Sequence, residues 1–203
     1  MAGLETRKQR ERRQHCEEIL AAAFRLFARN GFEGTTMAEI AAETEFAVGT
    51  LYTFFKDKED LYGRIILRIG EEFDEACTAA LEAPGSGTDK IERYIDAHIA
   101  MFVKHAAVGR YFILRGGAFV APLGAVDRVL RDRFERTLKT LAGILERGMR
   151  EKIFAPMNPR MLALALEGLI NSFIPALAED PEAFSAEEMS DVVRKVFFER
   201  VRL

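Results

Sequence analysis

The sequence contains little cysteine and has no surplus of positive charge. Its 203 residues include two cysteines, Cys16 and Cys77, and the formal net charge is −3. Neither cysteine stands in a CxxC or Cys/His spacing, so we expect reduced, structural thiols in a cytosolic protein and no metal site. The acidic balance argues against a generally basic surface for nucleic acid, so any contact with DNA must be local.

Long uncharged hydrophobic segments are also missing. The longest apolar run, residues 161–177, is interrupted by Glu167, Asn171 and Pro175, so we interpret it as a buried helix and expect no membrane association. The charged N-terminus is not followed by an apolar run, which argues against a signal peptide. HExxH, GxSxG and glycine-rich phosphate-loop motifs are absent, so we expect no enzyme and no cofactor.

Apolar residues recur at helical spacing along the whole chain, and no stretch shows the alternation of a strand. The pattern predicts helices at about 14–29, 36–43, 47–54, 57–80, 88–105, 123–151, 160–178 and 185–202, with a less regular helical segment near 111–119. The expected fold class is therefore all-α, with about nine helices. We place an N-terminal domain at residues 1–60 and a second domain at 61–203, with the helix from residue 57 belonging to both.

The stretch from Thr35 to Leu61 carries the most specific pattern. Thr36 is followed three residues later by Glu39, which is a capping box that opens a short helix. A second short helix follows after a turn of about 3–4 residues, and Asp57 caps a third. Two short helices joined by such a turn are typical of a helix-turn-helix.

Taken with Gly31-Phe32 and the helix before it, the strings TTMAEIA and GTLYTFFKDKEDL resemble the DNA-binding domain of the TetR/AcrR (tetracycline-repressor) family of bacterial transcription regulators. The resemblance spans roughly residues 12–67, and beyond it only length and helical layout agree. It implies a homodimeric regulator, most simply a repressor, that binds a pseudo-palindromic DNA operator and is released by a hydrophobic small-molecule effector. It also implies that these residues lie at or near DNA: Thr35, Thr36, Val48, Gly49, Thr50, Tyr52, Thr53, Phe54 and Lys58.

Three residues depart from the family pattern. Glu45 replaces the usual turn glycine and must either adopt a left-handed conformation or use a different turn. Ala47 replaces the usual serine cap, which is worth roughly 1 kcal/mol, and Phe54 replaces a hydrogen-bonding aromatic. An alternative therefore stays open, an all-α small-molecule-binding or interaction protein whose helix-turn-helix no longer binds DNA. The basic cluster at residues 7–13 is either an arm toward DNA or a solvated tail.

The second domain combines many phenylalanines with few polar interruptions, which suits a largely apolar ligand held by a few polar groups. The candidate ligand-binding residues are His98, Phe102, Phe112, Phe119, Phe134, Glu167 and Asn171, although phenylalanines at helical spacing also serve as ordinary core. His98 and His105 lie about two helical turns apart without a third ligand nearby, so we expect no metal.

The family resemblance further implies that the last two helices of each subunit form a four-helix dimer bundle. The residues predicted at that interface are Leu164, Gly168, Phe173, Val192, Val196 and Phe197. Glu167 and Asn171, one turn apart, point either into the ligand pocket or into the dimer contact.

Overall fold

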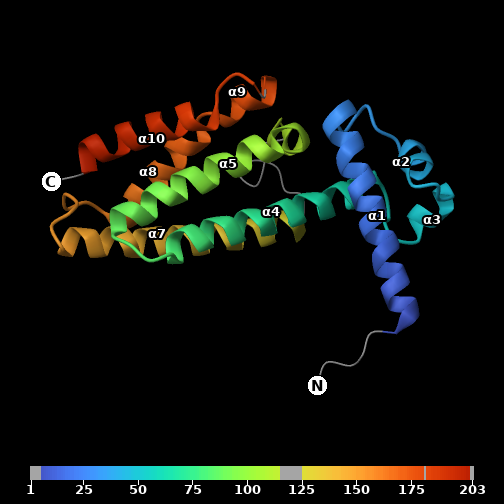
Figure 1. Cartoon of the computed structure of the whole chain (residues 1–203), viewed down its shortest axis with the longest axis horizontal. Coiled ribbons are helices and arrows are strands. Elements are labelled where there is room, and N and C mark those ends of the chain that lie inside the picture. The colour runs from blue at the N-terminus through green and yellow to red at the C-terminus, as the bar shows by residue number, and fades with distance from the viewer. Residues whose placement is uncertain (1–5, 115–124, 181, 202–203) are drawn as a thin grey trace. The chain divides into compact units, whose positions relative to one another are not determined.

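The computed structural model describes residues 6–114, 125–180 and 182–201, apart from the side chains of residues 109–114, 125–127, 178 and 200. All regular structure in these ranges is α-helical, which confirms the all-α prediction. The helices are α1 (Arg7–Asn30), α2 (Met37–Glu43), α3 (Val48–Tyr52), α4 (Lys58–Glu82), α5 (Gly87–Leu114), α7 (Ala125–Arg150), α8 (Pro159–Asn171), α9 (Ile174–Glu179) and α10 (Ala186–Val201), as Figure 1 shows.

The chain divides into two compact units, Met1–Ile66 and Leu67–Leu203. The division falls inside α4 rather than in front of it. The first turns of α4 belong to the N-terminal unit because Tyr62 packs edge-on against Phe27 and Phe32, with ring centroids 5.4 and 5.0 Å apart. Leu61 and Ile65 on the same helix are buried as well.

Helix α1 begins seven residues before the predicted start at Gln14. Thr6 is its N-cap: the Thr6 hydroxyl accepts from the Gln9 amide at 3.3 Å, and the Gln9 side chain accepts from the Thr6 amide at 2.8 Å. This capping box orders the basic cluster as exposed helix. The cluster is therefore not a disordered tail, and its side chains lie exposed along the first turns of α1. That these side chains contact DNA stays a prediction.

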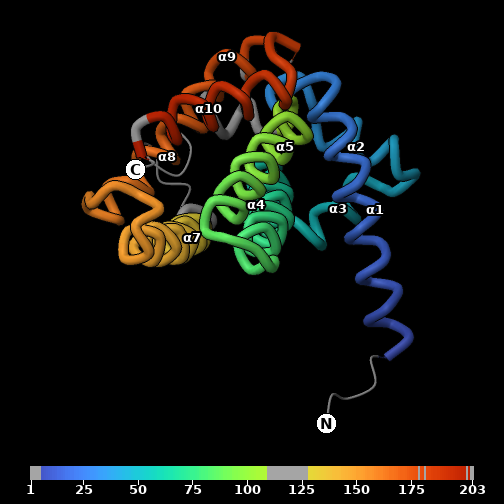
Figure 2. The backbone as a smooth tube through the Cα atoms, turned by 60° about the vertical axis from the view of Figure 1, so that its left-hand side comes forward, coloured from blue at the N-terminus to red at the C-terminus, as the bar shows by residue number. Residues whose placement is uncertain are grey.

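The core of the C-terminal unit lies where α5 packs on α9 and α10 and where α7 packs on α8. Figures 1 and 2 both show α5 running beside α4 and α10. Helix α5 continues to Leu114, past its predicted end near His105, so residues 111–114 form its last turn and no separate helix. The rest of the less regular segment predicted near 111–119 lies outside the described residues.

The helix predicted at 160–178 is two helices. Helix α8 ends at Asn171, and α9 starts at Ile174 with Pro175 in its first turn, where the missing proline N–H removes no helical hydrogen bond. By length and composition, Pro159–Leu177 is apolar enough to cross a membrane, the only such segment in the described ranges. Core helices of other folds meet that criterion too, and α8 buries one face through Leu162, Leu166 and Ile170.

Candidate nucleic-acid interface and ligand site

Helices α2 and α3 form the predicted pair of short helices. The Thr36 amide donates to Glu39 Oε2 at 2.7 Å, and the Thr36 hydroxyl accepts from the Glu39 amide at 3.2 Å. The hydrogen bonds from Thr36 lower the pKa of Glu39. After α2, the Phe46 amide donates to the Ala41 carbonyl at 3.0 Å, and α3 starts at Val48. The capping box and short turn predicted from the sequence are confirmed.

The turn between α2 and α3 has the two unfavourable features expected from the sequence, a left-handed non-glycine residue and a missing side-chain cap. Glu45 has a φ of 56°, in the left-handed region that favours glycine. Ala47 is the N-cap of α3 and makes no side-chain capping bond. The chain therefore keeps the family's turn geometry with a residue that is strained in it.

We expect Glu45→Gly with Ala47→Ser to stabilise the N-terminal unit by about 2 kcal/mol. Glycine relieves the left-handed strain, worth about 1 kcal/mol, and serine supplies a cap worth about 1 kcal/mol. Thermal unfolding of the full chain measures this gain. As a control, Glu33→Gly removes a glutamate from an exposed position without positive φ, and stability should fall slightly. A double variant no more stable than the natural chain would contradict the strain argument.

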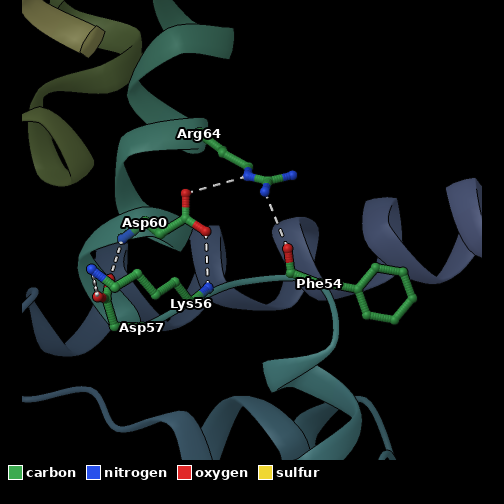
Figure 3. A network of polar contacts seen from close by, with 5 residues as sticks. All are labelled: Phe54, Lys56, Asp57, Asp60 and Arg64. Atoms are coloured by element: carbon green, nitrogen blue, oxygen red, sulfur yellow. Dashed lines mark hydrogen bonds and ion pairs between the residues drawn. The ribbon is translucent and has the colours of Figure 1, made fainter.

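A polar network fixes the end of α3 to the start of α4 (Figure 3). The Asp57 carboxylate accepts from the Asp60 amide at 2.8 Å, and Asp60 accepts from the Lys56 amide at 3.0 Å. Arg64, one turn further, lies 3.5 Å from Asp60 and donates to the Phe54 carbonyl at 3.1 Å. Since Phe54 lies two residues after the end of α3, these contacts hold the recognition helix in a defined place on α4.

The outer side of α3 is open to solvent. Tyr52 is 53% exposed, and Val48, Gly49 and Thr53 are exposed, whereas Leu51 is fully buried in the core. Thr50 is half-buried, and Thr36, at the start of α2, is exposed. Five of the nine predicted DNA-contacting residues are therefore accessible to solvent: Thr36, Val48, Gly49, Tyr52 and Thr53.

Two residues predicted at DNA have other roles. The Thr35 side chain is fully buried, and its hydroxyl donates to the Gly31 carbonyl at 2.8 Å. Lys58 Nζ donates to the carbonyls of Phe32 and Thr35 at 2.8 and 2.9 Å and lies 4.2 Å from the centre of the Phe32 ring. We therefore reassign both side chains to holding the loop between α1 and α2.

Arg12 belongs to the α3 surface, although sequence reasoning left it in the basic cluster. Its guanidinium lies 4.9 Å from the centre of the Phe54 ring and donates to the Thr53 carbonyl at 3.2 Å. Phe54 is half-buried beneath it. From the sequence alone, only the helical spacing of the basic residues could have indicated that Arg12 faces α3. That spacing has a meaning only because α1 includes these residues.

The C-terminal unit contains a buried polar chain that joins α5 to α8. The Tyr94 hydroxyl donates to Glu167 Oε1, and His98 Nδ1 lies 2.9 Å from the same hydroxyl. Because the Tyr94 proton is used toward Glu167, His98 Nδ1 must carry the hydrogen that points at Tyr94. Glu167 Oε2 is buried and has no hydrogen-bond partner in the described part of the protein.

Burial controls the protonation of this chain. It raises the pKa of Glu167 to about 7, against a smaller lowering by the Tyr94 hydrogen bond, and it lowers the pKa of His98 to about 3. It also raises the pKa of the nearby Cys77 thiol to about 12, with a contribution from Glu167. The histidine is therefore neutral near pH 7, and the glutamate titrates there.

Two aromatic rings pack against His98, at the end of the buried row of polar residues. The His98 ring lies 5.0 Å from the Phe73 ring and 4.8 Å from the Phe102 ring, and the two phenylalanine rings lie 5.0 Å apart. Phe73 and Phe102 are only half-buried. Phe73, Cys77 and Tyr94 were missed from the sequence, because the approach of Phe73 to His98, and of Cys77 and Tyr94 to Glu167, depends on how α4, α5 and α8 pack.

The other predicted ligand residues that the structure describes do not belong to the hydrogen-bonded row of Tyr94, His98 and Glu167. Phe134 is half-buried against the core, and Asn171 is half-buried at the end of α8. The Phe112 side chain and Phe119 lie outside the described residues. Glu167 is 2% exposed and points into the subunit, so of its two predicted orientations the structure favours the interior. No group of three metal-ligating side chains occurs within the described ranges.

The outer faces of α8 and α10 carry exposed apolar side chains. Leu164, Val192 and Val196 are each more than two-fifths exposed, and Gly168 has open space around its Cβ position. Phe173 is half-buried and stacks edge-on with Phe184 at 5.9 Å. Phe197 is 3% exposed within the subunit core, so its placement at the dimer interface is wrong. It points inward because it stands one residue out of phase with Val196.

Comparison with known proteins agrees with this geometry. The family described as "Bacterial regulatory proteins, tetR family" matches residues 19–65, which include α2, α3 and the start of α4. The uncharacterized HTH-type transcriptional regulator YhgD of Bacillus subtilis is 26% identical over 148 residues, covering 73% of this chain and 76% of that protein. The chain belongs to the TetR family.

Solved structures extend the agreement beyond the helix-turn-helix. A TetR/AcrR-family regulator from Thermobifida fusca has a TM-score of 0.78 at 21% identity, covering 91% of this chain and 97% of that one. AibR, solved in complex with isovaleryl coenzyme A and operator DNA, has a TM-score of 0.71 at 20% identity, covering 91% and 98%. This TetR-family protein is thus a transcriptional regulator with a DNA-binding helix-turn-helix domain, and its relatives are regulators rather than enzymes.

Proposed function

We propose that this TetR-family protein is a cytoplasmic, homodimeric repressor that binds a pseudo-palindromic operator and is released by a hydrophobic small molecule. The observation that carries the proposal is the solvent-facing side of α3, held in place by the Asp57–Arg64 network. A recognition helix must present its outer residues in a fixed orientation in order to enter the major groove.

The effector part of the proposal rests on the buried chain of Tyr94, His98 and Glu167 with its aromatic neighbours. The related fold of AibR, seen with both a small molecule and operator DNA, is a precedent for two ligands on this architecture. Helix α4 contributes to both units, since it carries Asp60 at one end and Cys77 near the other. We propose that the effector acts through α4 and favours a state that does not fit the operator.

Operator binding is the direct test. We expect the purified protein to bind fragments of its own genomic neighbourhood, with affinity that falls steeply as salt rises because phosphate contacts release counterions. Tyr52→Phe removes one exposed hydroxyl and should weaken operator binding about tenfold, since a hydrogen bond to a charged phosphate is worth about 1.5 kcal/mol. The melting temperature should not change, because Tyr52 is exposed.

The matched control is Thr78→Val, which removes an exposed hydroxyl from the C-terminal unit and should leave affinity unchanged. Protein that binds no fragment, and that mass spectrometry shows to be free of bound small molecules, would contradict the repressor proposal.

The homodimer is tested through the outer faces of α8 and α10. We expect Val192→Asp with Val196→Asp to make the protein monomeric at micromolar concentration in light scattering, since charges placed in an apolar contact cost several kcal/mol. Ala100→Asp, at an exposed position of α5, is the control and should stay dimeric. If the double variant remained dimeric, the interface would have to lie elsewhere.

A further inference from the structure

Glu167 Oε2 is an unused polar atom in an apolar environment. Its partner oxygen, Oε1, accepts from Tyr94, whereas Oε2 is buried without a hydrogen-bond partner in the described structure. Leaving such an atom unpaired costs about 1–3 kcal/mol. A ligand that supplies a proton donor here would recover that cost, so the atom marks a point of recognition.

The groups around Glu167 cannot supply that donor. On α5, the Tyr94 proton points at Glu167 Oε1 and the hydrogen on His98 Nδ1 points at Tyr94. On α4, the Cys77 thiol is a weak donor. The buried residues that α7 and α10 contribute to this core are apolar: Leu138, Leu141, Leu145, Met189, Val193, Phe197, Phe198 and Val201. Among the described side chains of α10, the buried polar one is Ser190. Among the described residues, the base paired with Glu167 is His98, whose Nδ1 lies 3.8 Å from Oε1. Because His98 is neutral near pH 7, the carboxylate keeps its capacity for a positive charge from outside.

The aromatic rings beside His98 narrow the chemical class of ligand that this site would bind. Phe73 and Phe102 contact each other and His98, and both keep part of their ring surface exposed. Ring faces attract cations and also pack well on alkyl chains. A ligand carboxylate would instead place a second negative charge near Glu167, which is unfavourable.

We propose that the effector is a hydrophobic amine whose ammonium group binds Glu167 Oε2 and whose apolar body lies along Phe73 and Phe102. The inference deepens the proposed function and rests on it, because it names the chemical class that the regulator senses. It distinguishes this protein from regulators whose effector is a free fatty acid, even where the fold is shared.

The test compares three probes of one chain length, octylamine, octanol and octanoate, by calorimetry on the full chain without DNA. We expect octylamine to bind at least about tenfold more tightly than octanol, and octanoate to bind most weakly, because only the amine pairs with the carboxylate. In Glu167→Gln the preference for the amine over the alcohol should disappear. Glu75→Gln, on the exposed side of α4, is the control and should keep it.

A second measurement needs no variant. Octylamine stays protonated between about pH 5 and 7, whereas Glu167, with its pKa raised to about 7, must release a proton in order to pair with it. The affinity should therefore rise about tenfold per pH unit in this range and level off above it. Octanol affinity should not change with pH.

Equal binding of octylamine and octanol, tightest binding of octanoate, or no amine binding would each overturn the inference. Its failure is separable from that of the proposed function. Octanoate that binds tightly and releases operator DNA would overturn the amine but support the regulator. Octylamine that binds through Glu167 without releasing DNA would support the site and contradict ligand-induced release.

Discussion

Glu167→Gln is expected to make the protein's stability fall by about 1.4 kcal/mol more per pH unit than that of the natural chain as the pH drops from 6.5 to 4.5. These limits are the ordinary pKa values of histidine and glutamate, and burial moves His98 to about 3 and Glu167 to about 7. In this window the folded protein holds a proton on Glu167 that the unfolded chain has released. It lacks a proton on His98 that the unfolded chain holds.

The two groups have opposite effects on stability. A raised carboxyl pKa favours folding at low pH, and its contribution is lost as the pH rises through 7. A lowered histidine pKa favours folding at high pH, and its contribution is lost as the pH falls below 6.5. In the natural chain the two slopes cancel between 4.5 and 6.5. Glutamine removes one of them, so the histidine slope is left uncompensated, for a total of about 3 kcal/mol over two pH units.

Urea unfolding at a series of pH values measures this difference. Burial also lowers the pKa of His105, but that group is present in both proteins and drops out of the comparison. Above about pH 8 the variant should be the more stable of the two, because it no longer has to ionise a buried carboxyl group. Glu75→Gln, on the solvent side of α4, should follow the natural chain. Parallel curves for Glu167→Gln and the natural chain would show that Glu167 titrates normally.

Gly148→Ala is expected to destabilise the protein by about 2 kcal/mol. A Cβ at this position would lie 2.3 Å from Phe154 Cδ2, far inside van der Waals contact, and Phe154 is fully buried. The turn after α7 brings the two together: the Ile153 amide donates to the Gly148 carbonyl at 2.8 Å, and Lys152 has a φ of 59°. Phe154 must move out of its place, and overpacking of this kind costs about 1–3 kcal/mol.

Gly143→Ala is the matched control on the same helix. A Cβ there meets nothing within 4 Å, so alanine should stabilise the helix by up to about 1 kcal/mol. Chemical unfolding of both variants measures the contrast. If Gly148→Ala were as stable as Gly143→Ala, the ring of Phe154 would have to adapt at little cost.

Local sequence signals predicted the helix-turn-helix well. The Thr36 and Glu39 capping box, the short turn and the strained Glu45 are interactions between residues close in sequence, so spacing alone reveals them. The same kind of signal was present in Thr6 and Gln9, but the prediction started from apolar periodicity, which begins only near Cys16. A helix whose first turns are wholly polar gives no such periodicity.

Contacts between distant residues could not be read in this way. Lys58 holds the Phe32 and Thr35 carbonyls because of where a loop backbone lies, which residue type does not encode. Tyr94 and Glu167 are 73 residues apart, and only helix packing brings them together. Glu167 and Phe102 were selected as chemically plausible, whereas their partners Tyr94 and Phe73 look like ordinary core residues.

The helical order of residues 7–13 changes the entropy available for binding. A flexible segment loses about 1–2 kcal/mol of backbone freedom per residue when a partner orders it. The basic side chains of α1 have already lost that freedom during folding, because Thr6 caps the helix ahead of them. The helical segment is also shorter than a flexible one. Seven helical residues span about 10 Å, whereas seven extended residues span about 23 Å. A polyanion that approaches the basic side chains is therefore bound without a further cost in backbone entropy.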